Sequence, residues 1–137
     1  MITRLDHIAL AVPDLDLAIR RFCDDLGLTL AGTEDVVSAQ TKTAFLPIAG
    51  TQIELVHPLD GKGAIQKYLD GKPEGGLHHL CFQTDDIHAD VARLREKGYR
   101  FTTEAPFGGA HGCTVIFVHP KSAGGVLIEL SQPGAHG

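Results

Sequence analysis

The chain contains LDHIALAVPDL at residues 5–15 and LHHLCFQTDDI at residues 77–87. In both stretches a histidine opens a run that alternates like a strand, and an aspartate then precedes a helical pattern. His7 and His79 occupy the same place in the two copies and are 72 residues apart, about half of the 137-residue chain. A repeat of this length predicts two modules of the same fold.

Each copy leads into an amphipathic helix. Apolar residues from Leu15 to Leu26 recur at helical spacing and Gly27 ends the run, and a second helix is expected from Ile87 to the stop at Gly98. Alternating stretches predict strands at residues 2–12, 28–37, 43–48 and 52–56 in the first half, and at residues 78–84, 99–103, 113–118 and 126–131 in the second half.

These elements predict an α+β fold, in which two tandem βαβββ modules form one curved mixed sheet around a cavity. Module 1 covers about residues 1–58, a linker with a short helix at residues 64–69 covers residues 59–76, and module 2 covers about residues 77–132. Because half of a curved sheet cannot bury its own face, the modules are expected to build a single domain over residues 1–137.

Composition excludes several classes of protein. Hydrophobic residues make up 43% and charged residues 21%, as in ordinary globular domains. A net charge of −5 without a basic stripe argues against nucleic-acid binding. No apolar run approaches the roughly 18 residues of a membrane helix, and no signal peptide is recognisable, so a cytoplasmic location is expected. Three cysteines without C-x-x-C spacing indicate free thiols.

Chemistry is expected from two repeated pairs of side chains. His7 opens the first strand of one module and Glu54 lies on its last strand, and His79 and Glu129 repeat this arrangement in the other. A carboxylate among apolar strand residues is costly unless it is paired or bound to metal. A lone histidine on a strand is usually structural, but two imidazoles and two carboxylates suit one divalent ion of Co, Zn, Ni, Mn or Fe. The sequence therefore predicts a metal-containing cavity.

Nearly the whole chain resembles the vicinal-oxygen-chelate (glyoxalase/bleomycin resistance) superfamily. The stretches that carry the resemblance are Leu5–Ala9, Thr43–Pro47, Ile53–Leu55, Gly76–Leu80, Asp85–Ile87 and His119–Leu130. The resemblance implies that all four predicted ligands match metal positions of the superfamily and that Glu129 also matches its catalytic base. The reaction implied is epimerisation of methylmalonyl-CoA or a similar acyl-CoA, by removal of the α-proton with metal stabilisation of the enolate.

The resemblance also implies further site residues. Thr43 stands where some relatives carry a second glutamate, so Glu54 or a water held by the metal becomes the candidate for the second acid. Two further candidates come from the residues themselves: Lys121 is a cation for the anionic coenzyme, and His111 lies in a glycine-rich loop that is a candidate for closing over a substrate. A homodimer is expected, because relatives in the superfamily are often dimers.

Two other functions fit the same residues. One is a glyoxalase-I-type lyase or isomerase acting on a hemithioacetal, because its chemistry is also proton transfer beside a bound metal. The other is a non-enzymatic ligand-binding protein of the superfamily, although such proteins typically lack the metal ligands. A ring-cleaving dioxygenase is less favoured, since it would use two histidines and one carboxylate and keep open positions on iron.

Overall fold

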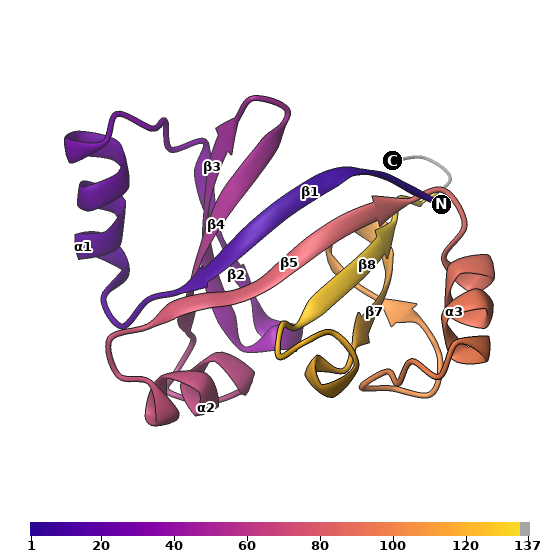
Figure 1. Ribbon diagram of the computed structural model, residues 1–137. Helices are drawn as coiled ribbons and strands as arrows, with labels where there is room; N and C mark the ends of the chain where they lie inside the picture. Colours follow the sequence, from indigo (N-terminus) through magenta and orange to yellow (C-terminus); the bar gives the residue numbers. More distant parts are fainter. Residues whose placement is uncertain (135–137) are drawn as a thin grey trace. The chain divides into compact units, whose positions relative to one another are not determined.

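The structure is a computed structural model and describes residues 1–134 (Figure 1). Its helices and strands, in chain order, are β1 (Ile2–Ala11), α1 (Leu15–Ile19), the π-helical turn η1 (Arg20–Asp25), β2 (Gly32–Val36), the 3-10 turn η2 (Val37–Ala39), β3 (Thr41–Ile48), β4 (Thr51–Pro58), α2 (Ala64–Gly71), β5 (Gly76–Thr84), α3 (Ile87–Glu96), β6 (Phe107–Gly108), η3 (Ala110–Gly112), β7 (Thr114–Val118), η4 (Pro120–Ser122) and β8 (Ile128–Gln132). The predicted α+β class with mixed strand pairing is confirmed. None of the helices within residues 1–134 has the length and apolar character needed to cross a membrane.

The chain divides into two compact units: residues 7–78, and residues 1–6 together with the chain from His79 onward. In the unit of residues 7–78 the strand order is β2-β3-β4-β1. β1 and β4 run parallel, whereas β3 pairs antiparallel with both β2 and β4. Ala49 and Gly50 join β3 to β4 with φ of 48° and 83°, which is the positive-φ geometry that a two-residue hairpin turn requires.

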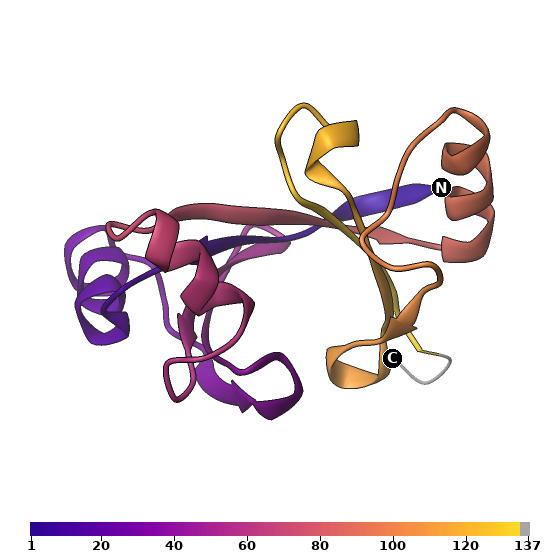
Figure 2. The same cartoon turned by 90° about the horizontal axis from the view of Figure 1, so that it is seen from below.

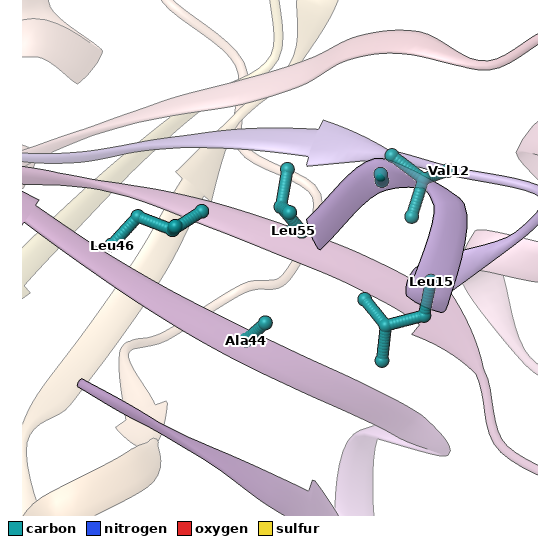
Figure 3. Packing of buried hydrophobic residues seen from close by; sticks show 6 residues of the cluster. Val12, Leu15, Ala44, Leu46 and Leu55 are labelled. Carbon is teal, nitrogen blue, oxygen red and sulfur yellow. The ribbon is translucent and has the colours of Figure 1, made fainter. Parts of the chain in front are cut away.

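The two faces of β4 in this unit are covered by different helices. Leu55 points to the face covered by α1, where it packs with Leu46, Ala44 and Leu15 in an apolar cluster (Figure 3). Val56, the next residue, points the opposite way and packs with residues of α2. Glu54 alternates with Leu55 and therefore shares the face of Val56, away from the α1 cluster.

The other unit has the strand order β1-β5-β8-β7-β6, with only the first residues of β1 taking part. β5 and β8 run parallel, and β7 pairs antiparallel with β8 and β6. Helix α3 covers one face through Ile87 and Val91, which pack against Ile116 and Leu130. Each unit thus contains a parallel strand pair whose connection includes a helix and two further strands.

Some sequence predictions were imprecise. The first helix changes to π-type hydrogen bonding after Ile19, where the Leu26 amide donates to the Arg21 carbonyl. The strand predicted at residues 99–103 is wrong, because this segment makes only an isolated bridge from Phe101 to β7, and the edge strand is β6. The final strand begins at Ile128 rather than at residue 126, since the preceding loop contains glycines with positive φ.

A buried carboxylate stabilises the unit that contains α3. The side chain of Asp90 is 1% exposed and accepts hydrogen bonds from the Thr84 hydroxyl and from Arg93, and the Met1 ammonium lies 3.2 Å away. Burial acts to raise the pKa of Asp90, but these donors outweigh it and hold the pKa below its ordinary value of 3.8. Ionised Asp90 therefore stabilises the fold.

Asp90→Asn is expected to lower the free energy of unfolding by about 1–3 kcal/mol at neutral pH, because charge-assisted hydrogen bonds are lost in a buried site. Because the folded pKa lies below the unfolded value, the stabilisation is present above about pH 3.8 and disappears as pH falls through the folded pKa. Urea unfolding at pH 7 and pH 3 should show the gap between parent and variant narrowing in acid. The exposed Asp70→Asn is the control, and a gap independent of pH would contradict the assignment.

Candidate metal and substrate site

His7 and Glu54 lie together in the unit of residues 7–78. Glu54 on β4 is directly opposite Ala9 on the parallel strand β1, and His7 precedes Ala9 by two residues on the same face. The Nδ1 atom of His7 is 3.1 Å from Oε2 of Glu54, and the two side chains are 10% and 14% exposed. Parallel pairing in this register therefore brings together one imidazole and one carboxylate that are 47 residues apart in the chain.

His79 and Glu129 repeat this geometry in the other unit. Glu129 on β8 is directly opposite Cys81 on the parallel strand β5, and His79 precedes Cys81 by two residues. The Nε2 atom of His79 is 3.1 Å from Oε1 of Glu129, with side chains 11% and 13% exposed. The histidine-to-glutamate register is therefore identical in the two units, as the sequence repeat predicts.

Glu54 has a polar neighbour on its own strand, and Phe45 lies opposite it on β3. The side-chain amide of Gln52 donates to Oε2 of Glu54 over 2.9 Å, from two residues earlier on the same strand. Thr43 is buried on β3, opposite Val56, and so shares the face of Glu54. The sequence analysis named Thr43 as a candidate site residue but did not name Gln52. Its place two residues before a candidate ligand on a strand was the signal that could have identified it.

Aromatic neighbours surround the pair in the other unit. Phe117 on β7 is directly opposite Glu129, and its ring meets the His79 ring edge to face, with 5.6 Å between centroids. Phe107 on β6 stacks on Phe117 at 6.5 Å. Such an apolar wall lowers the local dielectric and strengthens electrostatic interactions beside it. The sequence analysis did not predict these aromatic residues. A signal was present, because Phe117 stands 72 residues after Phe45 and therefore belongs to the repeat. Phe45 lies opposite Glu54, as Phe117 lies opposite Glu129.

His111 and Lys121 lie at opposite ends of β7. His111 belongs to the turn η3 before the strand, with a left-handed φ of 56°, and Lys121 belongs to the turn η4 after it. Figure 2 shows these turns on either side of the strand. Five residues of β-strand separate them, a length of about 16 Å. A ligand that contacted both predicted residues would therefore have to extend along the strand.

The donor chemistry of both pairs fits a divalent metal. Each pair offers one imidazole nitrogen and one carboxylate oxygen, and all four side chains are largely shielded from water. Nitrogen and oxygen donors of this kind suit borderline first-row ions, and enclosing apolar residues make an uncompensated carboxylate costly. Each histidine-glutamate pair is therefore chemically suited to supply ligands to such an ion.

Comparison with known proteins agrees with this arrangement. A profile of the Glyoxalase/Bleomycin resistance protein/Dioxygenase superfamily matches residues 6–117. An ethylmalonyl-CoA/methylmalonyl-CoA epimerase of Cereibacter sphaeroides is 41% identical over 133 residues, which cover 96% of this chain and 99% of that protein. The crystal structure of a methylmalonyl-CoA epimerase from Mycobacterium tuberculosis is 39% identical, with a TM-score of 0.87 over 98% of this chain and 91% of the other.

A further solved structure shows a methylmalonyl-CoA epimerase in complex with methylmalonyl-CoA and NH4+; it is 33% identical, with a TM-score of 0.87 over 98% of this chain and 97% of that one. The chain thus has the fold of the glyoxalase/bleomycin resistance superfamily and belongs to it. Within the superfamily, its similarity to methylmalonyl-CoA epimerases extends over nearly its full length.

Proposed function

We propose that this protein is a metal-dependent epimerase of methylmalonyl-CoA or a similar acyl-CoA. The observation that carries the proposal is the pair of histidine-glutamate contacts built in the same strand register, His7 with Glu54 and His79 with Glu129. They occur in a chain that is 41% identical to an epimerase of this kind over almost all of both proteins.

The reaction needs one group to remove the α-proton and another to return one. A divalent ion held by the four side chains would supply Lewis-acid stabilisation of the developing negative charge. Glu129 is the proposed base, and its carboxylate takes the proton from the α-carbon beside the apolar ring of Phe117. Glu54, once protonated from solvent, is the proposed acid that returns a proton to the opposite face, because residues 36–53 contain no carboxylate. The proton taken up by Glu129 then passes to solvent, which restores both carboxyl groups to their starting state.

The coenzyme A portion of the proposed substrate is long enough to extend between His111 and Lys121. His111 and Lys121 lie at the two ends of β7, and only an extended ligand reaches both. Lys121 is exposed and positively charged, which suits a phosphate of the coenzyme. Thr43 is buried on the face of Glu54 and is the proposed contact to the acyl portion.

The test is proton exchange at the α-carbon. The Co²⁺-loaded protein is incubated with methylmalonyl-CoA in heavy water, and loss of the α-proton signal is followed by NMR. Rapid exchange that a chelator abolishes is the expected result. Absence of exchange while the metal stays bound would overturn the substrate assignment, and the same assay with a glutathione hemithioacetal then tests the glyoxalase-type alternative.

A homodimer and a cytoplasmic location belong to the same proposal. The dimer is proposed because relatives in the superfamily are often dimers, and the location because the sequence has no recognisable membrane helix or signal peptide. Neither property is needed for the chemistry of the two histidine-glutamate pairs. Sedimentation velocity of the purified protein measures the first, and fractionation of cells that express the tagged full chain measures the second. A monomer across the micromolar range would remove the dimer from the proposal.

A further inference from the structure

Gln52 makes a direct contact with one of the proposed metal ligands. Its side chain is half-buried on β4, and its Nε2 donates to Oε2 of Glu54 over 2.9 Å. The Nδ1 atom of His7 is 3.1 Å from the same carboxylate oxygen. One oxygen of Glu54 thus faces two nitrogen atoms that come from different parts of the chain.

This contact restrains the orientation of the carboxylate. A glutamate side chain has a broad terminal torsion, so its carboxylate plane is set by the groups that surround it. Gln52 and Glu54 are two residues apart on one strand, and their side chains therefore stand side by side on the same face. Because the contact is part-buried, water competes weakly with the amide, and the hydrogen bond holds one oxygen in place.

The other pair differs at the equivalent position. Leu127 stands two residues before Glu129 and has no hydrogen-bond donor in its side chain. The residue opposite Glu129 is Phe117, whose ring packs against His79. The two pairs share a strand register and an aromatic residue opposite the glutamate, Phe45 in one and Phe117 in the other. They differ in the residue two positions before the glutamate, which is polar in one pair and apolar in the other.

We infer that Gln52 is a positioning residue for metal binding, which acts by orienting the carboxylate of Glu54. The inference rests on the proposed ligand set, and it adds a residue that lies outside that set. Outer partners of metal ligands typically contribute about 10–100-fold to metal affinity, because they pre-orient the ligand before the ion arrives. Gln52 supplies this function to Glu54, whereas Leu127 is unable to supply it to Glu129.

The test measures metal affinity without substrate. Gln52→Met keeps the approximate length of the side chain and removes the amide, and Co²⁺ binding is followed by isothermal titration calorimetry. The variant is expected to bind Co²⁺ about 10–100-fold more weakly than the parent. Gln66→Met is the matched control, because the Gln66 amide also donates to a carboxylate over 2.9 Å, that of Asp70, on the exposed surface of α2. The control is expected to bind Co²⁺ as tightly as the parent.

The outcomes separate the role of Gln52 from general instability and from the proposed reaction. The melting temperature of metal-free protein is compared for each variant, and Gln52→Leu serves as a second substitution if Gln52→Met lowers it. Co²⁺ affinity within twofold of the parent in a folded variant would overturn the inference, and so would a parent that binds no divalent ion. A parent that binds Co²⁺ but exchanges no α-proton would instead refute the epimerase while leaving the role of Gln52 intact.

Discussion

Glu129→Gln is expected to lower turnover of the acyl-CoA substrate by about 10²–10⁴-fold, the range that positioned general bases contribute. The amide has almost the same shape as the carboxylate but cannot accept the α-proton. Glu129 is 13% exposed and contacts His79, so the substitution replaces an enclosed carboxylate without opening a cavity. The measurement is the rate of α-proton exchange under single-turnover conditions, with circular dichroism to verify the fold.

Loss of metal must be separated from loss of the base in this experiment. The Co²⁺ content of Glu129→Gln is therefore measured alongside its rate, and the rate is divided by the occupied fraction. Glu96→Gln, at the exposed end of α3, is the matched control in the same unit and is expected to match the parent. An occupancy-corrected rate within a few-fold of the parent would remove Glu129 from the role of base.

His7→Ala and His79→Ala are each expected to weaken metal binding by about 10²-fold or more, since removing a ligand costs at least as much as removing the outer partner of a ligand. The two effects should be similar in size, because both histidines sit at the same register position beside their glutamates. Metal content after dialysis, measured by elemental mass spectrometry, and titration with Co²⁺ are the two readouts.

His88→Ala supplies the control for these variants. His88 lies on the exposed side of α3, and its removal should leave metal content unchanged. Full occupancy in either His7→Ala or His79→Ala would refute the four-residue ligand set. A large loss in only one variant would show that a single pair binds the ion and that the repeat is structural in the other unit.

The helices and turns of the fold were the most predictable part. Asp14 and Asp86 cap the starts of α1 and α3 with their side chains, and Gly27 and Gly98 follow the helical segments with φ of 89°. These are local effects of side-chain hydrogen bonding and of glycine at left-handed φ, so the sequence alone reveals them. The prediction of a strand at residues 99–103 was wrong because strand pairing depends on a partner far away in the chain. In the structure β7 pairs with β6, and residues 99–103 make only an isolated bridge.

The candidate site likewise has a part that could be predicted from the sequence and a part that could not. Strand alternation and a 72-residue repeat are enough to single out His7 with Glu54 and His79 with Glu129 as candidates from the sequence. The strand register that brings each histidine within 3.1 Å of its glutamate is visible only in the folded chain. The tertiary structure also decided that an amide lies beside Glu54 and an aromatic ring beside His79. The physical reason is that register and side-chain contacts arise between strands far apart in the chain, where no local pattern records them.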